Sequence, residues 1–252
     1  YAGPFAITLG KIRGAKTFKS YICVFVCLST KAIHLELASD LSADAFLACF
    51  RRFLARRGRC EKVYSDCGTN FQAGSKYIHN LFKNAVESNY IQWHFNPPSA
   101  PHFSGLAEAG VKSVKTHLYR VIGEQILTYE ELYTLLCQIE ALLNSRPLYP
   151  LSNDPNDLSV LTPGHFLNLE PLTALPDPDY TTCKLNSLNR FELIQRFRQE
   201  FWRRYRDEYL HHLQQRQKWL EPTSPSVTIN KLVLIKNDIM PPLKWSLGRI
   251  IA

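Results

Sequence analysis

The chain has 252 residues, and its 45% hydrophobic, 12% aromatic and 21% charged side chains exclude a disordered, collagen-like or low-complexity protein. Its longest apolar run, Tyr21 to Leu28, is too short to cross a bilayer, so no membrane partner is expected. A net charge of +8 favours a polyanionic partner such as nucleic acid, with ordinary solubility charge as the alternative.

Strand and helix patterns alternate along the first part of the chain, after which helices dominate. The strand patterns are Tyr1–Leu9, Tyr21–Leu28, Ala32–Ala38, Lys62–Ser65 and Tyr90–Phe95. Helical spacing covers Leu41–Arg57, Lys76–Ser88, Gly105–Ile122, a segment from Thr128 to before Pro147, and 188–219. We expect Ser42 or Asp40 to cap the first helix, Gly58 to end it, and Thr128 with Glu131 to form a capping box. The pattern predicts a mixed α/β fold.

Three further segments have a clear composition. The loop Asn96–Ser104 contains Pro97, Pro98 and Pro101, and the stretch 147–186 is typical of an extended connector. The tail returns to strand patterns at Lys231–Lys236 and Trp245–Ala252. None of the seven cysteines forms a CxxC pair, so the sequence predicts no zinc site and indicates a reducing compartment.

Asp66 stands where the predicted strand Lys62–Ser65 ends and a turn containing Gly68 begins. The end of a strand in an α/β sheet can hold a side chain rigidly toward a cleft, which suits a metal-binding carboxylate. The structural alternative is an aspartate that caps the turn. The sequence pattern alone leaves both open.

Glu108 falls in the first turn of the helix predicted from Gly105, with Lys112 and Lys115 on the same helix face. This arrangement would suit a metal that meets a phosphodiester, with the lysines on the flanking phosphates. The alternatives are a carboxylate that complements the helix dipole, or an exposed Glu–Lys pair that contributes about 0.3–0.5 kcal/mol.

Many ordered blocks of the sequence resemble the integrases of BEL/Pao-type LTR retrotransposons, which share the retroviral-type catalytic core. Asp66 and Glu108 lie in the blocks that correspond to its second and third acidic motifs. The matching blocks cover nearly the whole chain and are Tyr1–Phe5, Lys31–Glu36, Ser65–Phe71, Asn96–Ser99, Pro101–Glu108, Val111–Lys115, Leu143–Leu148, Leu161–Leu167 and Pro241–Trp245.

The resemblance implies an α/β fold of the RNase H-like superfamily, with a mixed five-stranded sheet flanked by helices, followed by a long helix and a small SH3-like β-barrel. We therefore expect residues 1–170 to form the catalytic core, 171–221 a connector with the long basic helix, and 222–252 an incomplete SH3-like domain. The family holds two divalent metal ions, Mg²⁺ or Mn²⁺, with three carboxylates, of which Asp66 and Glu108 correspond to the second and third.

The first carboxylate of the family has no counterpart in the sequence. In relatives an Asp directly precedes the block that begins here at Tyr1, and residues 1–10 contain no acidic side chain to replace it. We expect the two-metal site only with that upstream Asp, and the chain as given to be inactive alone. Two smaller departures are Ala107, where relatives usually have tryptophan, and Ser104, where glycine is usual.

The C-terminal part offers further candidate DNA contacts. The helix predicted over 188–219 is rich in arginine and aromatic residues and could lie along DNA phosphates. The favoured alternative is an amphipathic connector whose aromatic side chains pack on another helix and whose arginines are solvated. In the tail we expect Lys236 and Lys244 to bind DNA from the barrel, and Trp245 to be a core residue.

The leading hypothesis is a polynucleotidyl transferase that trims the DNA ends of a retrotransposon and joins them to target DNA. It would act as a homo-oligomer on DNA in the nucleus, and reside in the cytoplasm before integration, without a small-molecule substrate. A second hypothesis is a catalytically inactive, degenerate or domesticated DNA-binding derivative. A third is a nuclease of the same fold, which the block-by-block resemblance disfavours.

Overall fold

The computed structural model describes the chain except for residues 13, 84–90, 98–104, 174, 215–228 and 252, and the side chains of residues 106 and 107. The described residues form two compact units. The first unit comprises Tyr1–Leu28, Ile33–Thr116 and Glu124–Leu136, and the second comprises Ser29–Ala32, His117–Gly123 and Cys137–Ala252. The predicted domain boundaries at 170 and 221 stay a prediction. No helix in the described part of the chain has the length and apolarity needed to cross a membrane.

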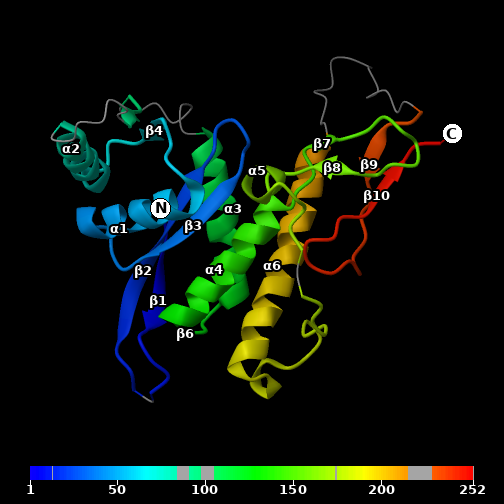
Figure 1. Ribbon diagram of the computed structural model, residues 1–252. Coiled ribbons are helices and arrows are strands. Elements are labelled where there is room, and N and C mark those ends of the chain that lie inside the picture. Colours follow the sequence, from blue (N-terminus) through cyan, green and yellow to red (C-terminus); the bar gives the residue numbers. More distant parts are fainter. Residues whose placement is uncertain (13, 84–90, 98–104, 174, 215–228, 252) are drawn as a thin grey trace, which may run out of the picture. The chain divides into compact units, whose positions relative to one another are not determined.

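A four-stranded sheet is the centre of the first unit (Figure 1). Its strands, in spatial order, are β3 (Ile33–Ala38), β2 (Thr17–Val26), β1 (Ala2–Thr8) and β6 (Leu127–Thr128). β1 and β3 both run antiparallel to β2, whereas β6 runs parallel to β1. β2 begins four residues before its predicted start, because Thr17 to Ser20 pair with the second half of β1.

Helix α1 (Ala43–Arg57) covers one face of this sheet. Ser42 caps it by accepting a hydrogen bond from the Ala45 N–H, and Gly58 ends it with a φ of 80°, as predicted. Its buried residues join one aromatic-rich core cluster with residues of β2, β3 and the next helix, namely Cys23, Ala38, Phe46, Cys49, Phe50 and Ile78. The strand that ends just before Asp66 packs against this cluster through Val63, so burial of the cluster holds that strand in place.

Helix α2 (Thr69–Lys83) packs closely on α1. A Cβ placed on Gly74 would lie 2.7 Å from the Phe46 ring, so only glycine allows this approach. The helix begins seven residues before its predicted start at Lys76, and the predicted end at Ser88 lies outside the described residues.

Strands β4 (Lys62–Ser65) and β5 (Gln92–Phe95) pair in parallel as a separate two-stranded sheet. The predicted single five-stranded sheet is therefore not confirmed among the described residues, although the mixed α/β class is.

The two ends of β1 pair differently. Its register with β2 shifts between Ala2 and Phe5, where Pro4 has no N–H to donate, and β6 pairs in parallel beside Ile7 and Thr8.

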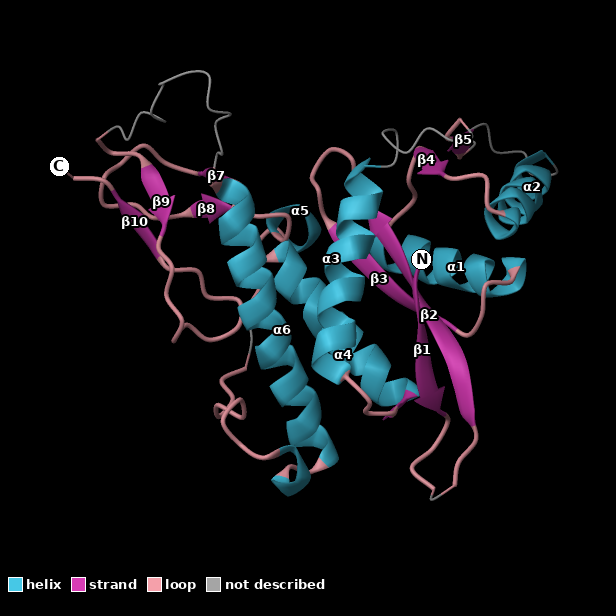
Figure 2. Ribbon diagram, turned by 180° about the vertical axis from the view of Figure 1, so that it is seen from behind, coloured by secondary structure: helices cyan, strands magenta, loops and turns pink. Residues whose placement is uncertain are grey.

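Helices α3 (Gly105–Ile122) and α4 (Tyr129–Asn144) follow. α3 has the predicted bounds, and Figures 1 and 2 place its first part on the face of the sheet opposite α1, where a Cβ on Gly110 would lie 3.4 Å from Val26. The predicted capping box of α4 is confirmed by reciprocal hydrogen bonds of Thr128 and Glu131 at 2.8 and 3.2 Å.

A buried charged cluster fastens α1 to β3. The Glu36 carboxylate is fully buried and accepts hydrogen bonds from His34 Nε2 at 2.9 Å, from Arg52 Nε at 2.6 Å and from Arg56 Nη2. Arg56 also donates to the Tyr133 hydroxyl at 2.7 Å. We call Glu36, His34, Arg52 and Arg56 the Glu36 cluster.

The second unit is built on the long helix α6 (Arg190–Leu213). Asn189 and Glu192 form its capping box, and one face is buried through Leu193, Ile194, Phe197, Phe201, Trp202 and Tyr205. It also includes the last part of α3 and the second half of α4. The other elements described in it are β7 (Tyr149–Pro150), β8 (Val160–Leu161), α5 (His165–Asn168), the 3₁₀ helix η2 (Leu185–Ser187), β9 (Leu232–Leu234) and β10 (Leu247–Arg249). The predicted connector 147–186 thus contains β7, β8, α5 and the start of η2, which its composition did not reveal.

The C-terminal segment is held by α6 and by residues before β8. Trp245 donates from Nε1 to the Ser145 hydroxyl at 3.2 Å, and its ring packs edge-on against Trp202. Arg249 donates to the carbonyls of Ser152 and Asp157 at 2.6 and 2.9 Å. Within the described residues β9 pairs with β10 alone, so the SH3-like barrel stays a prediction.

Candidate functional site

Asp66 lies at the carboxyl end of β4, where the sequence placed it. Its side chain is exposed, and its Oδ1 accepts a hydrogen bond from the Gly68 N–H at 2.9 Å. A Cβ on Gly68 would lie 3.0 Å from this oxygen and 2.9 Å from Asn70 Oδ1. Glycine is therefore needed at position 68 to keep the carboxylate in place.

The strand end before Asp66 is fixed by a short chain of hydrogen bonds. Trp93 donates from Nε1 to the Ser65 hydroxyl at 3.0 Å, which donates in turn to the Asp66 carbonyl at 2.9 Å. The Asn96 N–H donates to the Ser65 carbonyl at 2.8 Å, and the Cys67 thiol to the Asn96 carbonyl at 3.3 Å. These contacts hold the end of β5 and the Asp66 turn together, so the carboxylate has a rigid support.

Phe71 anchors the other side of the turn and brings it to the start of β1. Its ring packs edge-on against Phe46 at 4.9 Å and stacks on Tyr1 at 5.6 Å between centroids. Burial raises the pKa of the Tyr1 hydroxyl well above its usual range, with the neighbouring Cys23 thiol adding to the effect. Tyr1 is therefore a neutral packing residue beside the Asp66 turn.

Glu108 lies in the first turn of α3 and is exposed. Lys112 and Lys115 are exposed on the same helix, one and two turns further on. These three residues and Asp66 all belong to the first unit. The position of Glu108 in the first turn also complements the helix dipole.

The available donors fit a hard divalent cation in part. Asp66 and Glu108 offer carboxylate oxygens, and Mg²⁺ is usually bound by one or two carboxylates together with substrate phosphates and water. Among the described residues, no group of three His, Cys, Asp or Glu side chains could hold a metal ion. Both carboxylates are of the chemical type that Mg²⁺ binds, and a two-metal site would require a further carboxylate.

The predicted DNA contacts of the tail lie in the second unit. Lys236 and Lys244 are both exposed. On α6, Arg198 is buried against Asp177 at 2.5 Å and Arg206 against Asp238 at 2.7 Å, so these two arginines are engaged within the unit. The buried aromatic face supports the interpretation of α6 as a packed connector, but the prediction that its arginines are solvated is wrong for Arg198 and Arg206.

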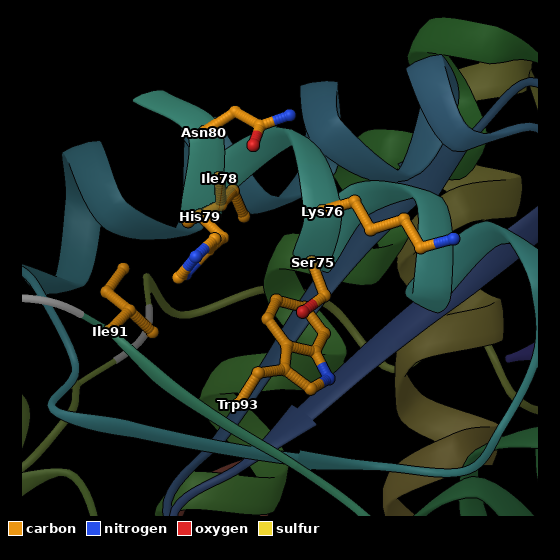
Figure 3. A pocket seen from close by; sticks show the side chains of 7 residues that line it. All are labelled: Ser75, Lys76, Ile78, His79, Asn80, Ile91 and Trp93. Carbon is orange, nitrogen blue, oxygen red and sulfur yellow. The ribbon is translucent and has the colours of Figure 1, made fainter. Parts of the chain in front are cut away.

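A pocket of about 400 Å³ lies between α2 and β5 (Figure 3). Its apolar side is formed by Ile78, Ile91 and Trp93, and its polar side by Ser75, Lys76, His79 and Asn80. Neither Asp66 nor Glu108 lines it. The candidate site therefore rests on the Asp66 turn, which the pocket adjoins only through the shared residue Trp93.

Sequence reasoning missed three features of this region. Glu36 and His34 of the Glu36 cluster lie in a block that carried the resemblance, but a strand pattern cannot show which arginines of α1 reach Glu36. The fit of Gly68 against the carboxylate was not anticipated. Tyr64 and His94 form an exposed ring pair across β4 and β5, and their positions two residues from Asp66 and Asn96 were the available signal.

The comparisons with known proteins give limited matches. Residues 189–252 match the model of a family of unknown function, DUF5641, and no curated protein matches the chain. The chain is similar to one in the cryoEM structure of the simian T-cell lymphotropic virus intasome in complex with PP2A regulatory subunit B56 gamma, with 17% identity and a TM-score of 0.45. That alignment covers 66% of this chain and 55% of the intasome chain, so the chain spans about half of that relative.

A second similar structure is the HTLV-2 integrase catalytic core domain in complex with magnesium, in its trimeric form. Its identity is 14%, its TM-score is 0.41, and the alignment covers 60% of this chain and 86% of that one. With both TM-scores below 0.5, the fold assignment rests on the described elements. From β1 to α3 their order, three strands, helix, strand, helix, strand and helix, is the one that the sequence predicted, whereas β6 was not predicted.

Proposed function

We propose that this chain is the catalytic part of a BEL/Pao-type retrotransposon integrase, a polynucleotidyl transferase that trims and joins element DNA ends to target DNA. The observation that carries the proposal is the placement of Asp66. Its exposed carboxylate stands at the end of a parallel strand, is oriented by the Gly68 N–H, and lies within the block that resembles the family's second acidic motif.

The chain's own residues would position a phosphodiester and its metal. Asp66 and Glu108 would hold Mg²⁺ or Mn²⁺, which when bound supplies positive charge to the reacting phosphate and activates the attacking oxygen. Lys112 and Lys115 would contact flanking phosphates along α3. The hydrogen bond from Gly68 and the support of Ser65 keep the Asp66 carboxylate fixed while the substrate binds.

A third carboxylate would complete the two-metal arrangement. The resemblance places an Asp directly before Tyr1, and the Tyr1 ring stacks on Phe71 of the Asp66 turn. An Asp at that position would be bonded to a residue that packs on the Asp66 turn. Because two DNA ends must be joined together, we expect the protein to act as a homo-oligomer on DNA, in the nucleus.

The second candidate is a DNA-binding derivative without catalysis. It is favoured by one observation, that no group of three metal-binding side chains is gathered among the residues described here. The two candidates differ in whether the chain joins DNA strands once a third carboxylate is supplied.

The test compares the chain extended by one Asp before Tyr1 with the same chain extended by Asn. The substrates are a labelled duplex carrying the terminal sequence of the encoding element and a plasmid target, in Mg²⁺. We expect joined products from the Asp form only, and Asp66→Asn to lower joining more than about 100-fold, since even residues that support metal ligands are worth 10- to 100-fold. DNA affinity should change little.

Two outcomes would contradict parts of this proposal. A form with Asp66→Asn that still joins strands in Mg²⁺ would remove Asp66 from the metal site. DNA binding without any joined product from the Asp-extended chain would favour the non-catalytic derivative.

A further inference from the structure

The parallel ribbon β4–β5 leaves one of its faces exposed. Successive residues of a strand point to opposite faces, and the pairing Val63↔Trp93 puts both side chains against the core cluster. The other face is formed by exposed residues of both strands, Lys62, Tyr64, Gln92 and His94. We call these four residues the outer face.

Two rings stack on this outer face. Tyr64 and His94 are directly opposed in the ladder, with ring centroids 4.9 Å apart and an interplanar angle of 18°. Tyr64 is 52% exposed. Parallel strands are normally covered on both faces, so an open aromatic pair on a parallel ribbon indicates a surface that another molecule covers.

The chemistry along β4 indicates which molecule this is. Lys62 and Tyr64 occupy alternate positions of β4 and share one face of the strand, and Asp66 follows directly after its last residue, Ser65. A cation, an open ring stack and the candidate metal-binding carboxylate therefore follow one another along this segment of the chain. A single-stranded nucleic acid presents the matching series of a phosphate, an unpaired base and a reacting phosphodiester.

We propose that the outer face binds an unpaired nucleotide at a DNA end. Its base stacks on the Tyr64–His94 pair, Lys62 contacts a neighbouring phosphate, and the next phosphodiester lies toward Asp66. An unpaired base fits this face best, because the bases inside a duplex are stacked on both faces and only the base pair at each end has one free ring face. This inference deepens the proposed function and rests on it, and it makes Tyr64 and His94 positioning residues.

The test measures binding, which does not require catalysis. The chain is titrated into a fluorescently labelled single-stranded oligonucleotide and, separately, into a blunt duplex of the same sequence, with fluorescence anisotropy as the readout. Tyr64→Ala and His94→Ala are each expected to raise the Kd for the single strand about tenfold, within the range measured for loss of a base-stacking ring. The Kd for the blunt duplex should change less than about twofold.

Two matched variants separate stacking from structural damage. Tyr64→Phe keeps the ring and should bind the single strand like the unchanged protein. Tyr77→Ala removes another exposed aromatic ring, on α2 and 44% exposed, and should leave the Kd unchanged. Circular dichroism of each variant shows whether it is folded, and photocrosslinking of 5-iodouracil-substituted single strand should modify the peptide that contains Tyr64 or the one that contains His94.

The outcomes distinguish this inference from the proposed function. If the unchanged protein binds DNA but folded Tyr64→Ala and His94→Ala bind the single strand equally well, the outer face is not the site. The same holds if Tyr64→Ala instead weakens self-association measured by sedimentation, because the face then contacts a second copy. If the unchanged protein binds neither form of DNA, the proposed function fails as well.

Discussion

Replacing Glu36 with Gln tests whether the buried carboxylate on β3 holds α1 against the sheet. Gln has nearly the size of Glu, so the change creates no cavity, but it removes the negative charge. It also turns one acceptor oxygen into an NH₂ donor. Because Arg52 donates to Oε2 and Arg56 to Oε1, at least one guanidinium group then faces a donor.

The contacts set the size of the effect. Removing one partner of a buried charged group lowers the free energy of unfolding by about 3–5 kcal/mol. The side chains of Arg52 and Arg56 are 38% and 37% exposed and can regain water, so we expect a loss of about 2–3 kcal/mol. Urea denaturation followed by circular dichroism measures this loss. The midpoints of the two proteins can be compared if the m-value is unchanged.

The control for this prediction is Glu61→Gln, on an exposed residue just before β4. It should change the free energy of unfolding by less than about 0.5 kcal/mol. A loss below about 1 kcal/mol for Glu36→Gln would refute the reasoning, because the Glu36 cluster would then contribute no more than an ordinary surface pair.

The same variant has a predictable dependence on pH. Burial alone would raise the pKa of Glu36, but the hydrogen bonds from His34 and Arg52 and the charge of Arg56 outweigh it and hold that pKa below its usual range. The stabilisation by the Glu36 carboxylate is therefore fully present above its unfolded-state pKa of about 4.3. It is lost as the pH falls through the lower folded-state pKa. The difference in free energy of unfolding between the unchanged protein and the Glu36→Gln variant should therefore narrow in acid. A difference that widens in acid would contradict the role of the Glu36 carboxylate as the stabilising group.

Two further predictions concern the candidate site. Gly68→Ala should displace the Asp66 carboxylate and reduce Mg²⁺-dependent joining by the Asp-extended chain about tenfold or more, with unchanged DNA affinity. Its control is Gly10→Ala, where an added Cβ meets nothing within 4 Å, and equal activity of both variants would count against the fit at Gly68. Replacing Lys112 and Lys115 with Glu should weaken DNA binding and make the salt dependence shallower by about two units of log–log slope. An unchanged slope would return both lysines to the surface-pair interpretation.

The elements that the sequence predicted well are those set by local signals. β4 and α3 have the predicted bounds, because a short apolar alternation and a glycine after a proline-bearing loop mark them within a few residues. The caps of α1 and α4 followed from hydroxyl and carboxyl side chains spaced to meet backbone N–H groups. The exposed Asp66 at the end of β4 follows from the same kind of local reasoning.

The missed features depend on contacts distant in sequence. The helical start at Thr69 was hidden because Gly68 and Asn70 are typical of turns, whereas the Gly68 carbonyl accepts the first helical hydrogen bond from Gln72. β6 has only two residues and exists because it meets the end of β1. The separation of β4–β5 from the larger sheet is likewise a matter of strand pairing, which no pattern within β4 encodes.

The C-terminal part shows the same dependence in a stretch that a family model covers. That match begins at residue 189, yet Trp245 is hydrogen-bonded to Ser145 and Arg249 to the carbonyls of Ser152 and Asp157, all upstream of the matched residues. The half-buried Arg249 guanidinium hydrogen-bonds carbonyls of another segment and so ties the two segments together, since either one alone leaves polar groups unpaired. The structural boundary of the second unit therefore lies well before residue 189, and the tail with Lys236 and Lys244 owes its fold to the segment around β7 and β8 as much as to α6.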